Sequence, residues 1–395
     1  MTDRYDVVVI GAGLAGLQTA RLVAGHGLRV LLADRKGSLE RGVHTTGIFV
    51  RRSLDDFSLP PAYLGPAIRH ISLYAPSGRR LDLESPHDEF RIARMGELYT
   101  RWLKDAQAAG AEWLSGATYS NAQPHEAGSL VELEVDGGVR RVSARFLIGA
   151  DGATSRVARD LGLSANKQLI VGLEDVFEGG ATDSVPRLHT FFDRRLAPGY
   201  IAWVATDGHS THVGVGGYPG RFQPAAALKT FRERAASIIQ LGQLQVAERR
   251  GGRIPVGGVL PRLASERGLL VGDAAGAVSP LTAGGLDPCL RLSELAAKVV
   301  WRYLKSADAG QLAAYDGLEF RRRFRFRQML RNVYAWASYN PLLEAACAAS
   351  RLPVGRQLAA RVFFGHGSFP DVNETRAKPS ATAVQLKPSS ARLSR

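Results

Sequence analysis

Cysteine is scarce in this 395-residue chain, which contains only Cys289 and Cys347, far apart in the sequence. Such a pair offers neither a disulfide framework nor the ligand spacing of a zinc site, which indicates a reducing compartment. Long apolar runs are also missing, and none approaches the roughly 20 residues that a membrane-spanning helix requires. The first strand begins within a few residues of Met1, too soon for a signal peptide. We therefore expect a cytoplasmic protein.

Acidic residues are few relative to basic ones. The chain has 37 Asp and Glu against 51 Lys and Arg, which gives a net charge of +14. This excess favours a polyanionic partner such as an anionic lipid surface. No nucleic-acid recognition fold is visible, so nucleic acid is not expected as a partner. The hydrophobic content of 45% predicts a large core in one big domain or two intertwined domains.

The beginning of the chain contains a strand followed by a glycine turn. Residues 7–10 are apolar and all β-branched, which is typical of a parallel strand buried on both faces. Gly11, Gly13 and Gly16 then match the pattern GxGxxG. The first glycine permits a tight turn, the second lets a pyrophosphate approach the backbone, and the third lets the following helix pack close to the strand. The N-terminus of that helix provides an anion site.

A second buried strand is predicted at residues 28–33, and it ends at Asp34. An acid about twenty residues beyond the glycines accepts hydrogen bonds from the adenosine ribose of a dinucleotide. Because the carboxylate would repel a 2′-phosphate, NADP is disfavoured at this site. FAD and NAD remain as the bound dinucleotide.

Between residues 166 and 266 the pattern changes to alternating apolar and polar residues. Residues 68–83 alternate in the same way and predict a hairpin. Together these segments predict an antiparallel sheet with one covered face, which provides a wall for an apolar ligand. The individual strands are expected at residues 169–177, 187–192, 200–205 and 211–216.

Three segments far apart in the sequence are expected to bind a single ligand. Besides the glycine turn with Asp34, these are residues 149–156 (GADGATSR) and residues 272–286 (GDAAGAVSPLTAGGL). Together they resemble the flavoprotein superfamily that contains the aromatic hydroxylases and the geranylgeranyl reductases, and the third segment resembles the geranylgeranyl reductases most. FAD is long, so a protein that binds it extended needs contacts from several distant parts of the chain. An NAD enzyme would not need the third segment.

The resemblance implies which residues hold FAD. Asp273 would hydrogen-bond the ribitol, and residues 284–286 would offer backbone N–H groups to the pyrimidine edge of the flavin. Arg94 falls where these flavoproteins place an arginine near the cofactor, and Tyr119 where a backbone group meets adenine. The alternative interpretations are a solvated arginine at a helix start and, for Asp151, a simple turn aspartate. The predicted cofactor-binding residues are Gly11, Gly13, Ala15, Gly16, Asp34, Arg35, Thr45, Thr46, Arg94, Tyr119, Asp151, Gly152, Gly272, Asp273, Pro280, Gly284, Gly285 and Leu286.

The resemblance also implies an oxidoreductase that reduces an alkene of a prenyl-type substrate by hydride transfer from reduced flavin. NAD(P)H is one candidate electron donor, and it would dock transiently because no second GxGxxG is present. A monooxygenase acting on an aromatic or polyketide ring is the alternative within the superfamily. Such enzymes commonly have histidine after GDAA, where this chain has Gly276, which favours the reductase. A flavin-binding redox sensor without turnover is the third hypothesis.

The catalytic residues are less clearly marked. Geranylgeranyl reductases usually carry a cysteine near the flavin after the second strand, whereas residues 44–47 read HTTG here. Their PxxYxWxFP motif corresponds to residues 198–205, PGYIAWVA, which keep the proline and Trp203. His44 and Trp203 are therefore the candidates, with a surface histidine and a core tryptophan as the alternative interpretations.

We predict an α/β fold in which a Rossmann-like FAD/NAD(P)-binding domain is interleaved with an antiparallel-sheet substrate domain of α+β type, followed by C-terminal helices. The arginine- and aromatic-rich residues 320–336 are either a solvated helix face or a peripheral contact with the inner face of an anionic membrane. The expected boundaries are 1–60, 90–165 and 266–310 for the FAD-binding domain, 61–89 and 166–265 for the substrate domain, 311–364 for the helical region and 365–395 for a disordered tail.

Overall fold

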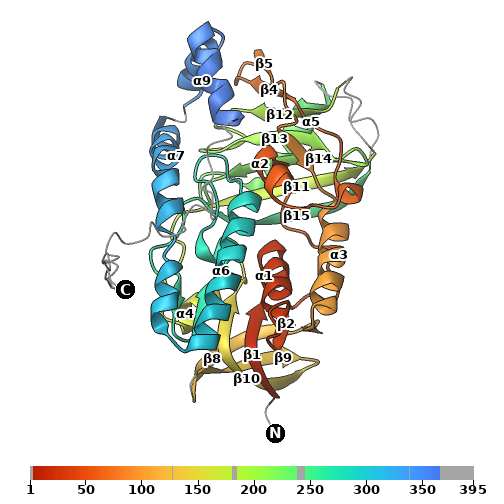
Figure 1. Cartoon of the computed structure of the whole chain (residues 1–395). Coiled ribbons are helices and arrows are strands. Elements are labelled where there is room, and N and C mark those ends of the chain that lie inside the picture. The colour runs from red at the N-terminus through yellow and green to blue at the C-terminus, as the bar shows by residue number, and fades with distance from the viewer. Residues whose placement is uncertain (1–2, 127, 180–184, 238–244, 338, 365–395) are drawn as a thin grey trace, which may run out of the picture.

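Two large β-sheets organise the chain (Figure 1). The structure is a computed structural model that describes residues 3–126, 128–179, 185–237, 245–337 and 339–364. The predicted disordered tail lies outside these residues. The sheet topology shows a mixed α/β fold with C-terminal helices, as the sequence predicts.

The first sheet is largely parallel. Its parallel strands, in spatial order, are β17 (Gly268–Leu270), β10 (Gly138–Gly149), β1 (Asp3–Ile10), β2 (Val30–Ala33) and β7 (Ala111–Leu114). The same sheet also contains antiparallel strands. β16 (Ala264–Ser265) pairs with β17, β9 (Gly128–Val135) pairs with the first half of β10, and β8 (Thr118–His125) pairs with β9. β10 is one long strand that serves both parts of the sheet, because it pairs with β9 in its first half and with β1 and β17 further along.

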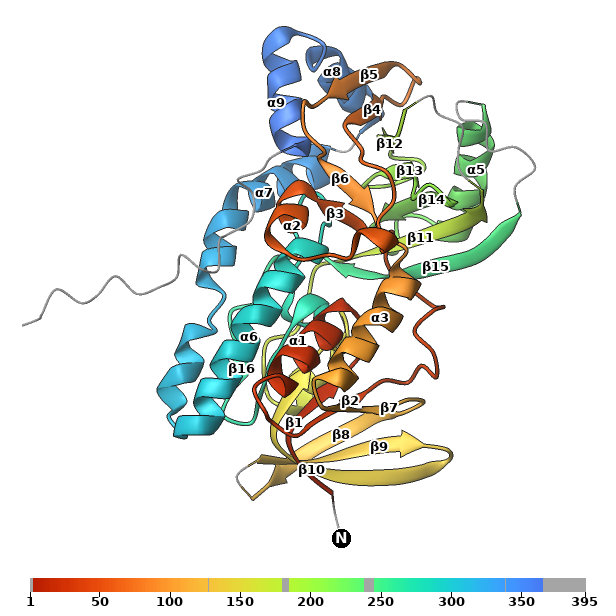
Figure 2. The ribbon, with the colours of Figure 1, turned by 45° about the vertical axis from the view of Figure 1, so that its right-hand side comes forward.

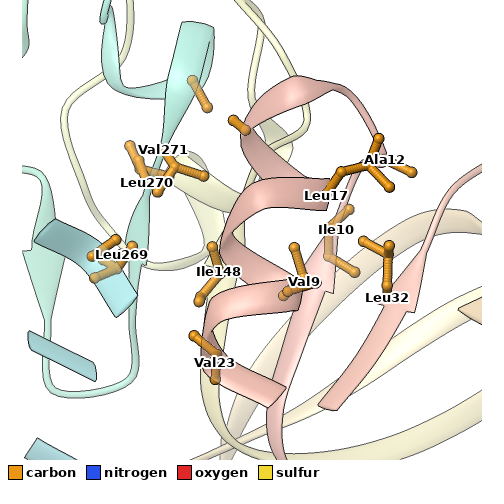
Figure 3. Close-up of a cluster of buried hydrophobic side chains, with 14 of the residues drawn as sticks. Val9, Ile10, Ala12, Leu17, Val23, Leu32, Ile148, Leu269, Leu270 and Val271 are labelled. Atoms are coloured by element: carbon orange, nitrogen blue, oxygen red, sulfur yellow. The ribbon is translucent and has the colours of Figure 1, made fainter. Parts of the chain in front are cut away.

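The helix α1 (Leu14–Ala24) packs on this sheet, between α3 (Met95–Ala108) and α6 (Leu286–Ser306) (Figure 1). Its apolar side is fully buried, and Figure 3 shows side chains of α1 lying against those of β1 and β10. Gly16 makes this approach feasible, because a Cβ atom there would lie 1.8 Å from the carbonyl oxygen of Gly11. The third glycine of the motif thus has the packing role that the sequence predicts.

The second sheet is antiparallel except for the parallel pair β12 and β4. Its strands, in spatial order, are β15 (Val246–Pro255), β11 (Leu169–Glu178), β14 (Ser210–Gly217), β13 (Ala202–Thr206), β12 (Arg187–Phe191), β4 (His70–Tyr74) and β5 (Arg80–Glu84). The helix α5 (Pro224–Ala236) packs against β14 and β11. The strands β3 (Ile48–Val50) and β6 (Phe90–Ile92) form a small separate pair.

Short helical segments connect these elements. They are α2 (Arg51–Asp56), α4 (Arg156–Asp160) and three 3₁₀ turns, η1 (Pro61–Tyr63), η2 (Gly272–Ala275) and η3 (Ala309–Ala314). The chain passes between the two sheets several times, because β4 and β5 come before α3 and β17 comes after β15. The division into domains at the residue boundaries given above stays a prediction.

The sequence analysis did not predict β15. β15 has ten residues with the sequence VAERRGGRIP, and its charges and two glycines disfavour a strand assignment. In the structure it is an edge strand that pairs with β11 along its whole length. Charged residues on an edge strand discourage pairing with other chains. The charges that disfavoured a strand assignment for β15 therefore suit its position at the edge of the sheet.

The described part of the chain ends with three helices, α7 (Leu318–Ala337), α8 (Asn340–Ala349) and α9 (Pro353–Phe363) (Figure 2). At its beginning, α7 buries Phe320 and Phe324 in the core of the first sheet. At the other end of the series, Phe363 and Phe364 pack against the core beneath β4 and β5. The C-terminal helices therefore bridge the two sheets. None of the helices in the described residues has the length and hydropathy to span a membrane.

Candidate active site

A cavity of about 1270 Å³ extends from the carboxyl ends of β1 and β2, past the second sheet, to α7, α8 and α9. Binding sites in sheets of this type lie at the carboxyl ends of the parallel strands. Small-molecule pockets commonly have volumes of about 300–1000 Å³. The cavity is thus large enough for a long cofactor together with part of a substrate.

The glycine turn forms one end of the cavity. Gly11 has a φ of +101°, and a Cβ atom there would lie 2.3 Å from the carbonyl oxygen of Ala150. Gly13 lines the cavity, and a Cβ atom there would meet open space. The opening therefore lies directly at the N-terminus of α1, where backbone N–H groups and the helix dipole favour an anion.

Asp34 lies beside this helix terminus at the end of β2. Its Oδ2 accepts a hydrogen bond from the backbone N–H of Ala12 at 2.6 Å, and its Oδ1 accepts one from the backbone N–H of Lys36 at 2.8 Å. These bonds fix the carboxylate at the cavity wall. Since an ionised carboxylate has about four acceptor positions, two stay available for ribose hydroxyls.

Asp273 faces the cavity from η2 in a different environment. Burial raises the pKa of its carboxyl group to about 6. No donor to this carboxyl group is found among the described residues. A buried carboxylate without donors is costly. A polyol chain in the cavity would supply the missing hydroxyl donors.

Asp151 and Tyr119 also line the cavity, but their side chains are engaged elsewhere. The carboxylate of Asp151 accepts hydrogen bonds from Ser155 Oγ at 2.6 Å and from the backbone N–H of Arg156 at 2.7 Å, so it caps α4. Burial raises its pKa. The hydroxyl of Tyr119 donates to Asp160 at 2.8 Å. Their cofactor contacts stay predictions.

The loop before α6 forms the opposite wall. Ala283 adopts a left-handed conformation with φ of 51°, and the backbone N–H of Ser279 donates to the carbonyl of Gly284. This compact loop places Gly285 at the N-terminus of α6, on the cavity wall. Arg327 of α7 supports it by donating to Ser279 Oγ at 3.0 Å.

Most of the predicted cofactor-binding residues thus line the cavity, but three do not. Gly16 lies behind the glycine turn, where it has its packing role. The guanidinium of Arg94 donates to Glu97 at 2.7 Å and to the carbonyl of Ala62. Pro280 is buried in the loop before α6. Arg94 and Pro280 do not line the cavity, and their contacts with the cofactor stay predictions.

The catalytic candidates both lie on the cavity wall. His44 donates from Nδ1 to the carbonyl of Gly251 at 2.8 Å, and partial desolvation together with the charge of Lys36 lowers its pKa. A neutral ring with Nδ1 protonated leaves Nε2 as an acceptor. The indole of Trp203 donates from Nε1 to Glu174 at 3.0 Å.

Sequence reasoning missed Glu174, which lines the same part of the cavity. Its carboxylate accepts hydrogen bonds from Thr46 Oγ1 at 2.5 Å and from Trp203, and it also contacts His212. Thr46 comes from the loop before β3, Glu174 comes from β11, and Trp203 and His212 come from the neighbouring strands β13 and β14. No local pattern at any of them could have marked the group.

The far part of the cavity is apolar. It is closed by side chains of the second sheet and the C-terminal helices, among them Leu73, Leu81, Leu188, Ile201, Leu330, Val333, Leu342, Leu343, Leu358, Val362 and Phe363. Such a surface binds hydrocarbon through the hydrophobic effect, which contributes about 25 cal/mol per Å² of buried area. The cavity therefore combines a polar dinucleotide end with an apolar arm.

The polar end fits FAD, because it offers a helix N-terminus for the pyrophosphate, Asp34 for the ribose and the donorless Asp273 for the ribitol. Bound FAD would supply two-electron redox chemistry. The fold and this cavity define an FAD-dependent oxidoreductase. Residues 4–332 match the family described as FAD binding domain, and the chain belongs to that family and to the geranylgeranyl reductases within it.

Comparison with curated proteins supports this assignment. The chain is 30% identical over 373 residues to digeranylgeranylglycerophospholipid reductase 2 of Methanopyrus kandleri, covering 88% of this chain and 91% of the relative. It is 28% identical over 321 residues to the geranylgeranyl diphosphate reductase of Rhodobacter capsulatus, covering 78% of each chain. These similarities favour a reductase over a monooxygenase.

Solved structures show the same fold. A geranylgeranyl bacteriochlorophyll reductase-like protein from Thermoplasma acidophilum superimposes with a TM-score of 0.79 at 19% identity, covering 95% of this chain and 98% of that one. The p-nitrophenol 4-monooxygenase of Pseudomonas putida gives a TM-score of 0.68 at 18% identity, with coverages of 94% and 96%. The fold is therefore shared by reductases and monooxygenases, and does not separate them.

Proposed function

We propose that this protein reduces carbon–carbon double bonds in the prenyl chain of a lipid. The observation that carries the proposal is the continuity of the cavity, in which the apolar arm opens directly from the polar end that fits FAD. A long hydrocarbon chain in this arm would reach the reacting end of the cofactor. The relatives are named as reductases of digeranylgeranylglycerophospholipid and of geranylgeranyl diphosphate, and both names describe prenyl compounds.

The side chains that line the arm favour a substrate whose reacting group is uncharged. The arm is lined mainly by aliphatic side chains from β4, β5, β12 and the C-terminal helices. An isolated alkene offers no hydrogen-bonding group, so such a substrate is held by burial and shape alone. His44 and Trp203, at the junction of the arm and the polar end, are proposed to orient the reacting part of the chain. NAD(P)H stays one candidate electron donor.

The outer end of the arm is proposed to meet an anionic membrane. Apart from Val139 and Val246, every exposed large apolar side chain in the described residues lies between residues 318 and 358. The most exposed are Trp336 at 87% and Val354 at 79%. Phe326, Met329, Val333 and Trp336 follow helical spacing on one side of α7.

The exposed apolar surface is continuous with the cavity. Val333, Leu342 and Leu358 are more than 45% exposed and also line the arm. Arg322, Arg323 and Arg325 are exposed near one end of this surface. A bilayer suits such a surface, since it accepts apolar side chains and its anionic headgroups attract arginines, each by about 1 kcal/mol. A lipid could then enter the arm without crossing water.

The structure changes the interpretation of residues 320–336. The arginines in this segment do not all face solvent, because Arg331 is fully buried against the rings of Tyr200 and Tyr218, and Arg327 reaches the loop before α6. The membrane contact is therefore proposed for the exposed side of α7 together with α8 and α9.

Anaerobic reduction followed by incubation with prenyl lipids tests the function. The FAD-loaded protein is reduced with dithionite, freed of excess reductant and mixed with vesicles that contain an unsaturated prenyl lipid. We expect the flavin to reoxidise without oxygen and the lipid to gain two hydrogens per turnover, as measured by mass spectrometry. Reoxidation only after oxygen is admitted, with a gain of one oxygen atom, would instead establish a monooxygenase. Reoxidation by neither route would favour the redox sensor.

A further inference from the structure

Glu174 on the cavity wall belongs to a buried group of three titratable side chains, which we call the acid–base cluster; the other two, His212 and Asp207, lie behind the wall. Their exposures are 4%, 2% and 4%. Oε1 of Glu174 lies 3.1 Å from Nδ1 of His212, and Oδ2 of Asp207 lies 3.6 Å from Nε2 of His212, which is an electrostatic contact but too long for a hydrogen bond. Buried charges are costly to keep and need a reason. Neither FAD binding nor the apolar arm requires them.

The strands of the second sheet hold this cluster rigidly. Glu174 lies on β11, His212 lies on the neighbouring β14, and Asp207 lies in the turn between β13 and β14. The turn is fixed because Oδ1 of Asp207 accepts hydrogen bonds from the backbone N–H groups of His209 and Ser210. Strand register therefore sets the positions of Glu174 and His212, and a hydrogen-bonded turn sets that of Asp207.

A hydrogen-bonded path connects the cluster to the cavity. Oγ1 of Thr46 lies 2.5 Å from Oε2 of Glu174, and the indole of Trp203 holds the same oxygen at 3.0 Å. Thr46, Glu174 and Trp203 line the cavity, whereas His212 is not part of its lining. The order from the cavity inward is thus Thr46, Glu174, His212 and Asp207.

The charges around the cluster keep a proton on His212. Burial by itself would lower the pKa of His212, but the two carboxylates outweigh it and raise the pKa to about 9. Burial would raise the pKa of Glu174, but the charge and hydrogen bond of His212 hold it below its ordinary value. Arg250, opposite Glu174 on β15, acts in the same direction and is itself paired with Glu248 at 2.8 Å. In the loop that carries Thr46, His44 is the titratable residue nearest to Thr46 in the sequence.

Saturation of one double bond requires two hydrogens of different kinds. A hydride brings both electrons and forms the first C–H bond while the π bond breaks. The second C–H bond then needs a proton, and the aliphatic side chains of the arm have none to donate. Resting on the reductase function proposed above, we propose that Thr46 donates this proton and that the acid–base cluster replaces it.

The transfer balances without a further reactant. Glu174 starts as a carboxylate and first receives the Nδ1 proton of His212 at Oε1. The carboxyl group then rotates and turns this proton toward Thr46, whose oxygen takes it as the hydroxyl proton of Thr46 forms the new C–H bond. His212 is left neutral and regains a proton from solvent before the next turnover. The two electrons come from the reduced flavin, so the cluster changes its protonation and not its oxidation state. Thr46 is the catalytic residue, and the cluster acts through it.

Four variants of the FAD-loaded protein test the relay. We expect Thr46→Val and His212→Asn to slow anaerobic reoxidation by prenyl lipid by about 100-fold or more, the lower range for loss of a general acid. Thr46→Ser keeps the hydroxyl and should restore the rate to within a few-fold. His189→Asn is the matched control, because His189 is also buried in the second sheet but does not line the cavity. It should leave the rate and its pH dependence unchanged.

The pH profile distinguishes a relay from a structural effect. The reoxidation rate of the unaltered protein should fall as pH rises through about 9, where His212 loses its proton, and His212→Asn should lack this limb. Reaction of the reduced flavin with oxygen should be the same in all variants. If the unaltered protein is reoxidised by lipid and Thr46→Val matches it, the relay is wrong. If the unaltered protein is not reoxidised at all, the reductase function has failed.

A second measurement does not depend on activity. In the protein labelled with ¹⁵N-histidine, we expect the nitrogens of His212 to show an imidazolium at pH 7 that titrates near pH 9. Glu174→Gln should shift this titration to lower pH. A neutral His212 at pH 7 would overturn the relay even in a protein that reduces lipids normally.

Discussion

Gly214 has no side chain, and the indole of Trp203 occupies the space that one would fill. A Cβ atom at Gly214 would lie 2.2 Å from Cζ2 of Trp203. The two residues are paired across β13 and β14, and Glu174 is paired with Gly214 on the other side. The missing side chain is therefore what lets an indole on β13 cross β14 and reach a carboxylate on β11.

Substitution of Gly214 by alanine should expel this indole. We expect Gly214→Ala to lower the free energy of unfolding by about 1–3 kcal/mol, the usual cost of overpacking, and to break the hydrogen bond to Glu174. Gly37→Ala is the control, since a Cβ atom there would meet nothing within 4 Å. Urea unfolding of both variants checks the difference, and equal stabilities would contradict the packing described here.

Asp273 should contribute strongly to FAD affinity. Hydrogen bonds to a charged group contribute about 1.5–3 kcal/mol, so we expect Asp273→Asn to weaken FAD binding by about 10- to 100-fold. Because burial raises the pKa of Asp273 to about 6, the affinity of the unaltered protein should also fall as the pH drops below 6. Fluorescence titration of the apoprotein with FAD measures both effects. Asp136→Asn, in an exposed hairpin turn, removes the same charge and should change neither.

At the residue scale, the sequence predicted positions where backbone geometry demands one residue type. Gly11 and Gly16 are such positions, because any side chain would collide with backbone. Glu174 and His212 are not. Their partnership depends on how β11 and β14 pair, and alternating strands contain many polar residues that could face either side. Arg94 shows the same limit, since a resemblance to a family gives a position in the chain but not the partners of its side chain.

At the scale of elements, α7 illustrates why composition misleads. Its sequence is crowded with arginine, yet Phe320, Phe324 and Arg331 are buried while Phe326 and Trp336 are exposed. An amphipathic assignment needs to know which neighbours cover the helix, and these come from both sheets. β15 presented the opposite problem, because an edge strand tolerates charges that a central strand would not.

The exposed face of α7, α8 and α9 makes a prediction about membranes. We expect the protein to sediment with vesicles that contain anionic lipid, and to be released by salt because the Debye length shortens. Val354→Asp on α9 should weaken this binding. Val139→Asp, at an exposed valine on β10, is the matched control and should not weaken it. Binding that is insensitive to Val354→Asp would place the contact elsewhere.

At the scale of the whole molecule, His212 makes the stability depend on pH. Its folded pKa of about 9 lies above the ordinary value of 6.5, so folding favours the imidazolium. This stabilisation is fully present below pH 6.5 and is lost as the pH rises through about 9. Its size is at most about 3 kcal/mol. Urea unfolding between pH 6.5 and 9.5 should show the loss, and His212→Asn should lack this slope. An equal slope in both proteins would contradict the assigned charge.

The late position of β17 in the sequence has a consequence for synthesis. β10 pairs in parallel with β17, and β17 is formed by residues 268–270. A ribosome must therefore translate about two thirds of the message before all strands of the first sheet are present. Chains that stop earlier would expose the flank of β10, and such fragments should be caught by chaperones rather than accumulate as yellow, flavin-loaded intermediates.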